Sequence, residues 1–172
     1  MKAAVLEALK KLSVKTVETP HAMAGELVVK VECCAVCGSD LRIFENGNPR
    51  VIFPRIMGHE IAGEIIEVGT GVTKFSEGER VSLGADVPCG ECQWCKNGLG
   101  NNCKKNLAIG YQMNGGFAEY IRLDETVVKY GPIAVLPAHT SFEEGCLAEP
   151  LACCINGMEV TGMKKGKSVL VI

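Results

Sequence analysis

The sequence predicts a mainly β protein with some α-helix that ends at the first strand of an α/β domain. Three observations support this class. Short valine-rich segments alternate with glycine-rich turns over the first two-thirds of the chain. Four cysteines crowd into one loop that interrupts these segments. Helical periodicity appears only late, just before an unbroken apolar strand.

The expected elements follow this pattern along the chain. Strands are predicted at 1–8, 12–18, 26–34, 60–68, 80–83 and 117–123. A short helix is expected at 38–45, with Ser39 or Asp40 as its N-cap. Late helices are expected at 141–148 and 151–161, and Pro150 between them predicts a kink or a fresh start.

The segment 167–172 follows Gly166 and is predicted to be a fully buried strand, because its apolar residues form a continuous run without alternation. Such a strand needs parallel neighbours, and no later segment is available to provide them. We therefore expect residues 1–150 to form one domain, with a metal-binding lobe at 86–105. Residues 151–172 would begin a second, truncated domain.

Bulk properties exclude several classes of protein. The 172 residues suffice for one core, burying roughly 70% of the unfolded surface. The net charge is −2 and no Lys/Arg run exceeds two residues, so nucleic acid is not expected as the main partner. No apolar run suits a signal peptide or a membrane span. We expect a cytoplasmic protein with no membrane partner.

The loop PCGECQWCKNGLGNNC carries the strongest functional signal. Its cysteines Cys89, Cys92, Cys95 and Cys103 follow the spacing C-x2-C-x2-C-x7-C, which lets one loop surround a single ion. Zinc is the leading interpretation. An iron–sulfur cluster has a similar opening but normally a closer fourth cysteine followed by proline, and disulfides belong mainly to secreted chains. Four thiolates leave no open position, so the site would be structural.

A second set of ligand-type residues is dispersed through the chain. Cys37 follows a predicted strand, His59 and Glu60 precede another, and Glu149 lies between the late helices. A mixed S, N and O set with one open position describes a Lewis-acid zinc site. From the residues alone, His59 could equally be an ordinary core histidine, Cys37 a core thiol and Glu149 a helix cap.

Several motifs together resemble one family. GHEIAG at 58–63, continuing to Gly69 and Val72, resembles the zinc alcohol dehydrogenase signature. CGSD at 37–40, the four-cysteine loop, TKFSEGERV at 73–81 and GGFAEY at 115–120 are similar to further family segments, in family order. The chain thus resembles the medium-chain dehydrogenases. That resemblance implies a GroES-like, partly open β-barrel, with 151–172 starting a Rossmann domain.

The resemblance also implies roles for individual residues. CGSDLRIFENG and Glu149-Pro150-Leu151 look most like the sorbitol, threonine and polyol dehydrogenases. Cys37 and His59 would then be catalytic zinc ligands, with Glu60 or Glu149 completing the set, and Ser39 would accept the alcohol proton. Liver-type enzymes have a histidine where this chain has Arg42, so the proton route beyond Ser39 is open.

The resemblance further implies the activity and its partners. Two zinc ions per chain would serve oxidation of a secondary alcohol or polyol, with hydride transfer to NAD or NADP, in a homo-oligomer (dimer or tetramer) when full length. The chain itself lacks G-x-G-x-x-G, since Gly69-Thr70-Gly71 continues without a third glycine. The fragment alone is therefore expected to be inactive.

Two other classes of function remain open. A non-catalytic, zinc-stabilised module would bind one ion per chain where the dehydrogenase half would bind two. A zinc protein that binds nucleic acid is disfavoured by the acidic balance and the aromatic-poor cysteine loop.

Overall fold

The computed structural model describes residues 1–170. Its strands are β1 (Lys2–Ala8), β2 (Lys11–Thr16), β3 (Leu27–Ala35), β4 (Arg55–Ile56), β5 (Glu60–Val68), β6 (Arg80–Leu83), β7 (Asp86–Val87), β8 (Leu107–Ala108), β9 (Tyr120–Leu123) and β10 (Ile133–Val135). Its helices are α1 (Gly38–Asn46), α2 (Gln93–Lys96), the 3₁₀-helix η1 (Gly100–Asn102), α3 (Glu125–Tyr130), α4 (Phe142–Cys146) and α5 (Ala148–Val160).

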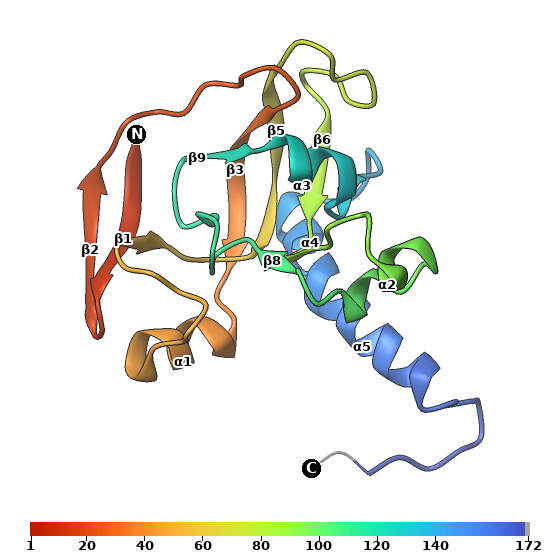
Figure 1. Cartoon of the computed structure of the whole chain (residues 1–172). Coiled ribbons are helices and arrows are strands. Elements are labelled where there is room, and N and C mark those ends of the chain that lie inside the picture. The colour runs from red at the N-terminus through yellow and green to blue at the C-terminus, as the bar shows by residue number, and fades with distance from the viewer. Residues whose placement is uncertain (171–172) are drawn as a thin grey trace.

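The strands form three antiparallel sheets. The largest has the order β10-β6-β5-β3-β9, a second has the order β2-β1-β4, and β7 pairs with β8. An isolated bridge between Ala3 and Ala118 joins the second sheet to the segment that enters β9. The small β7–β8 sheet lies at the base of the loop that contains α2 (Figure 1).

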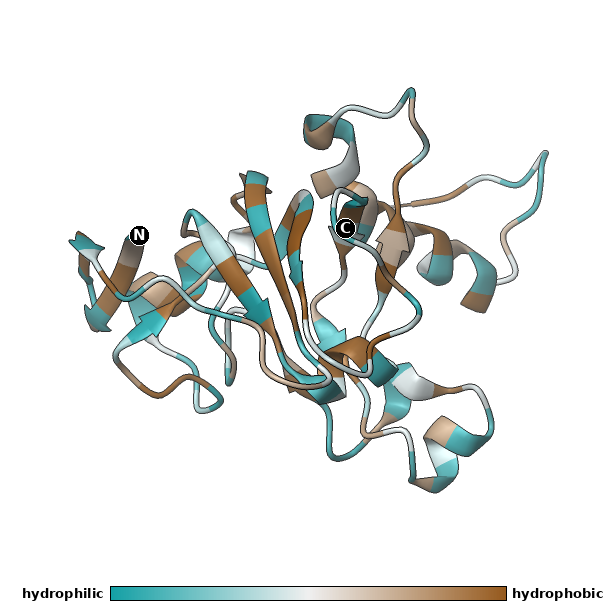
Figure 2. Cartoon of the chain, turned by 90° about the horizontal axis from the view of Figure 1, so that it is seen from above, coloured by the Kyte–Doolittle hydropathy of each residue, from teal (hydrophilic) through white to brown (hydrophobic). Residues whose placement is uncertain are grey.

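The core lies on the five-stranded sheet. The strands of the molecule carry both apolar and polar residues (Figure 2), and in this sheet Leu27, Val29, Ile61, Ile65 and Val81 are fully buried. Burying each such side chain stabilises the fold by roughly 1.5–3 kcal/mol. Cys37 follows β3, and His59 and Glu60 stand at the start of β5, so the sheet positions these ligand-type residues.

Most predicted strands are confirmed within three residues. β4, β7, β8 and β10 were not predicted, because two or three residues are too few to show a period of two. The six-residue helix α3 was not predicted either. The predicted N-cap of α1 is wrong. Cys37 caps the helix, and its sulfur accepts from the Ser39 amide while Asp40 accepts from the Cys37 amide.

The C-terminal part departs most from prediction. α5 begins at Ala148 and runs through Pro150, because a proline in the first turn removes an amide that has no helical acceptor. Residues 167–170 form no strand, and Val169 and Leu170 are 57% and 84% exposed. An apolar segment forms a strand only when another strand pairs with it. No strand within residues 1–170 pairs with residues 167–170. The rest of the predicted strand, 171–172, lies outside the described residues.

The sequence predicted no segment that spans a membrane. Within residues 1–170, no helix combines the length and apolar character needed to cross a bilayer.

Candidate metal centres

The four-cysteine loop folds so that its sulfurs converge. Cys92 caps α2, Cys95 lies within it, and Cys103 follows η1. The sulfur of Cys92 lies 3.4 Å from that of Cys95 and 3.8 Å from that of Cys103, while Cys89 and Cys95 are 4.0 Å apart. All four ligand atoms lie within 4.8 Å of one another. The structure thus brings together every cysteine that the spacing grouped.

Backbone amides favour thiolates in this loop. Backbone hydrogen bonding from Glu91 and Cys92 lowers the pKa of Cys89, and that from Cys95 lowers the pKa of Cys92 to about 6. Desolvation and the neighbouring sulfurs raise the pKa of Cys95. Because like charges crowd together here, some sulfurs keep protons until a cation neutralises the group. Metal binding should therefore release protons.

The second centre forms where two neighbouring strands end and begin. Ala35 at the end of β3 pairs with Glu60 at the start of β5. This register brings Cys37, two residues beyond β3, beside His59 and Glu60, and their ligand atoms lie within 4.8 Å of one another. His59 and Glu60 are only 5% and 6% exposed. Buried polar side chains of this kind need partners, and a cation is one such partner.

Gly58 makes this arrangement sterically possible. It adopts a φ of +89°, which residues with a side chain rarely adopt. A Cβ there would lie 2.7 Å from the Phe117 ring and 2.9 Å from the Cys34 sulfur. The glycine of the GHE motif thus lets the backbone turn tightly into His59.

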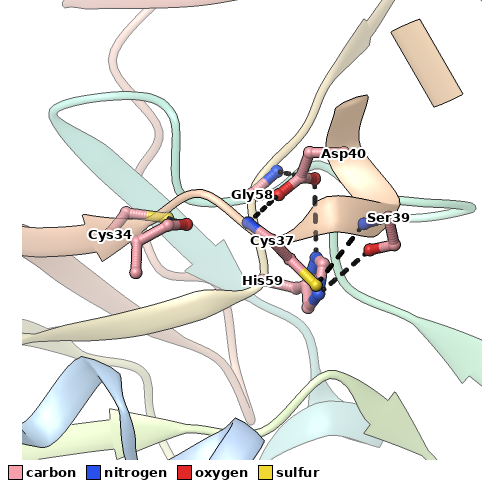
Figure 3. A network of polar contacts seen from close by, with 7 residues as sticks. Cys34, Cys37, Ser39, Asp40, Gly58 and His59 are labelled. Carbon is pink, nitrogen blue, oxygen red and sulfur yellow. Dashed lines mark hydrogen bonds and ion pairs between the residues drawn. The ribbon is translucent and has the colours of Figure 1, made fainter. Parts of the chain in front are cut away.

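Asp40 and Ser39 lie on opposite sides of the histidine ring. The Asp40 carboxylate accepts hydrogen bonds from the amides of Cys37 (3.0 Å) and Gly58 (3.3 Å), and lies 3.6 Å from His59 Nδ1. Ser39 Oγ lies 3.5 Å from the other ring nitrogen, Nε2. Figure 3 shows His59 between these two side chains at the start of α1, with the Cys37 sulfur alongside.

The charges around His59 favour the protonated ring when no metal is present. Burial lowers the pKa of His59, but Asp40 and Cys37 raise it more, to about 9. His59 Nδ1 is buried without a hydrogen-bond partner, because 3.6 Å is too long for one. Nδ1 thus faces a carboxylate while Nε2 faces Ser39. In many metal sites, the histidine binds the metal through one ring nitrogen while its other ring nitrogen faces a carboxylate.

Glu149 lies near this centre but outside its closest group. Its carboxylate is half-buried and accepts a contact from the Cys153 sulfur at 3.6 Å. Burial raises the pKa of Glu149, and the charge of His59 opposes that rise. Of the residues predicted for the mixed site, the structure therefore brings three together and leaves Glu149 adjacent.

Sequence reasoning missed two residues around His59. Asp40 was predicted only as a possible N-cap. In the structure its side chain is 3% exposed and faces the His59 ring. The Tyr111 ring lies 5.8 Å from the His59 ring, centroid to centroid, and had no predicted role. The position of Asp40, three residues after the ligand-type Cys37, is a weak sequence signal for its role. Nothing in the local sequence identifies Tyr111.

Fold and ligand geometry together define the metal-binding, GroES-like class of domain. The chain belongs to the alcohol dehydrogenase GroES-like domain family, whose family model matches residues 23–133. This confirms the resemblance drawn from the motifs and the mainly β fold class that it implied.

Particular relatives cover nearly all of the chain. It is 34% identical to a sorbitol dehydrogenase of Bacillus subtilis, over 100% of this chain and 48% of that protein. It is 39% identical to an alcohol dehydrogenase of Geobacillus stearothermophilus, over 99% of this chain and 50% of that protein.

A solved structure shows the same fold. It is described as a zinc-binding dehydrogenase from Sinorhizobium meliloti bound to NADP, and matches with a TM-score of 0.87 and 34% identity over 97% of this chain and 47% of its own. The present chain thus spans about half the length of the relatives it matches.

Proposed function

We propose that this chain is the zinc-bearing part of an oxidoreductase that oxidises a secondary alcohol or polyol to a ketone, with hydride transfer to NAD or NADP. The observation that carries the proposal is the pair of ligand groups, one of four sulfurs and one of mixed Cys37, His59 and Glu60 donors. The alcohol and sorbitol dehydrogenases among the relatives support the reaction class.

The four-sulfur group suits a structural zinc ion. With Zn–S bonds of about 2.3 Å, tetrahedral geometry requires sulfurs about 3.8 Å apart. Three of the separations are 3.4, 3.8 and 4.0 Å, close to this requirement, and all four sulfurs lie within 4.8 Å of one another. In this proposal Cys89, Cys92, Cys95 and Cys103 hold the ion and leave no position for a substrate.

The mixed group suits a zinc ion with an open position. Cys37 and His59 Nε2 would hold it, with Glu60 or Glu149 as the oxygen donor. When bound, zinc supplies Lewis-acid chemistry that acidifies an alcohol. Ser39 Oγ, 3.5 Å from His59 Nε2, is placed to take up a proton at that position. The Asp40 carboxylate lies 3.6 Å from Nδ1, behind the ring, and leaves Nε2 facing Ser39.

The nicotinamide cofactor would bind outside the described residues. Residues 1–170 contain no dinucleotide-binding fold, so no step of hydride transfer is assigned to them. The division into a catalytic domain at 1–150 and the start of a cofactor domain at 151–172 stays part of the proposal. So do the dimeric or tetrameric state and the cytoplasmic setting, which suits thiolate ligands.

Metal analysis of single-site variants tests the proposal. The purified chain should contain about two zinc ions. Cys37→Ala and Cys92→Ala should each contain one, because each removes a ligand from a different group. Cys154→Ser, which changes an exposed cysteine at neither group, should keep both.

The outcomes separate the two functional classes. One zinc ion in the parent chain, unaffected by Cys37→Ala, would favour a non-catalytic module with only the structural site. Two ions whose occupancy depends separately on Cys37 and Cys92 support the dehydrogenase assignment.

A further inference from the structure

Two cysteines outside both ligand groups lie in contact. The sulfurs of Cys33, in β3, and Cys146, at the end of α4, are 3.3 Å apart, although 113 positions separate them in the sequence. Neither residue belongs to the four-sulfur group or to the mixed group. Their proximity is therefore not explained by the proposed zinc sites.

Regular structure on both sides maintains the contact. The pairing of β3 with β5 shifts register between Val31 and Cys33, and such a bulge redirects the side chains beside it. On the other side, Ser82 Oγ donates to the Gly145 carbonyl at 2.8 Å and ties α4 to β6. Ser141 and Glu144 form a capping box that begins α4. Both sulfurs are thus carried by well-anchored backbone.

We propose that Cys33 and Cys146 form a site of reversible oxidative modification, in which a peroxide converts the two thiols into an intramolecular disulfide. The Cys33 sulfur attacks one peroxide oxygen, the O–O bond breaks, and a sulfenic acid and one water form from hydrogen peroxide. The Cys146 sulfur then attacks the Cys33 sulfur, the S–O bond breaks, and a second water leaves. The two sulfurs lose two electrons in total and the peroxide gains them.

The roles of the two sulfurs follow from their surroundings. Cys33 is partly exposed and is accessible to a small oxidant, whereas Cys146 is 3% exposed. Burial, and next the adjacent Cys33, raise the pKa of Cys146 to about 11. Because Cys33 is the accessible sulfur, it reacts with the oxidant, and Cys146, 3.3 Å away, resolves the sulfenic acid. Only about 1.3 Å of approach separates the contact from a disulfide of about 2.0 Å.

The crosslink would join the two segments that lead into the mixed site. The chain continues from Cys33 past the end of β3 to Cys37, and from Cys146 into the first turn of α5, where Glu149 lies. Oxidation would therefore fix these segments relative to each other without using any of the ligands. The inference does not depend on the proposed enzymatic activity.

Peptide mapping of the zinc-loaded chain tests the site. The protein is treated with hydrogen peroxide, blocked with an alkylating reagent without reduction, digested with trypsin and sequenced by tandem mass spectrometry. The expected product is the peptide carrying Cys33 joined to the peptide carrying Cys146, with the other cysteines alkylated. Its mass is about 2 Da below that of the same two peptides with Cys33 and Cys146 as thiols, and fragment ions place the link. Reduction should return both peptides to the thiol form.

Three variants make the assignment specific. Cys33→Ser and Cys146→Ser should each abolish the linked peptide, while Cys154→Ser should leave its yield unchanged. Circular dichroism checks that each variant is folded. The parent chain needs no substitution, so its map is decisive even if a variant misfolds. A folded, oxidised parent chain without the Cys33–Cys146 link would overturn the proposal, as would a link to Cys34 or Cys37 in its place.

Discussion

Asp40 shows at the scale of one residue how a cap and a metal site share a side chain. Its carboxylate closes the first turn of α1 through the Cys37 amide and also faces His59. The same negative charge thus stabilises the helix N-terminus and controls protonation of the ring. The sequence placed Asp40 at the start of α1, although as an N-cap and not as the third residue of the capping box, whereas the second role depends on a strand farther along the chain.

Replacing Asp40 with Asn should lower the pKa of His59 in the metal-free chain. The parent value of about 9 should fall toward the ordinary value near 6.5, because the adjacent negative charge is lost. Proton NMR titration of the three histidines measures this, with the exposed His21 and His139 as internal controls. A parent His59 that already titrates near 6.5 contradicts the prediction.

The same shift predicts how stability depends on pH. Since the folded-state pKa of His59 lies above its unfolded value, the stabilisation is complete below about pH 6.5 and is lost as pH rises through about 9. The loss for the metal-free chain is on the order of 3 kcal/mol. Urea unfolding at about pH 6 and about pH 9.5 should show this loss in the parent chain and a much smaller one in Asp40→Asn.

At the scale of elements, the four-cysteine loop depends on its ion. It contains only a four-residue helix and a three-residue 3₁₀-helix, too little regular structure to hold itself. Chelation should therefore make Lys96, Lys104 and Lys105 readily cleaved by trypsin, while β3 and β5 stay intact. Mass spectrometry of timed digests identifies the cuts. Equal cleavage with and without chelator would show that the loop folds without metal.

The β3–β5 pair should tolerate no side chain at Gly63. A Cβ there would lie 2.1 Å from the Lys30 carbonyl oxygen, so Gly63→Ala should destabilise the chain by about 1–3 kcal/mol. Gly157→Ala is the matched control, because nothing lies within 4 Å of that position in α5. It should stabilise the helix slightly. Denaturant unfolding compares the two, and equal stability of both variants would refute the steric argument.

The sequence predicted some elements and not others for physical reasons. Long segments rich in apolar residues, such as Glu60–Val68, carry their own signal, and so does the cysteine spacing. β7, β8 and β10 are short and exist because a neighbour pairs with them. The strand predicted at 167–172 had the local signal without a partner among residues 1–170. The mixed site could be predicted only in part. The sequence shows its ligand-type residues, but only the register between β3 and β5 brings them together.

At the scale of the whole molecule, stability should be distributed unevenly. The five-stranded sheet holds the main core, whereas no residue of α5 is buried. Leu151, Ile155 and Val160 are 59%, 42% and 78% exposed, and α5 extends away from the sheets (Figure 1). A helix of this length gains little stability without tertiary packing.

Amide hydrogen exchange should therefore separate these two parts of the chain. Amides near the end of α5 should exchange at least about 100-fold faster than those of β3 and β5, because local opening there breaks few apolar contacts. Exchange monitored by mass spectrometry of the zinc-loaded chain measures both regions in one experiment. Repeating it at two protein concentrations tests whether association covers α5. Protection of α5 equal to that of β5 at both concentrations would mean that intramolecular contacts stabilise the helix, against the exposure found here.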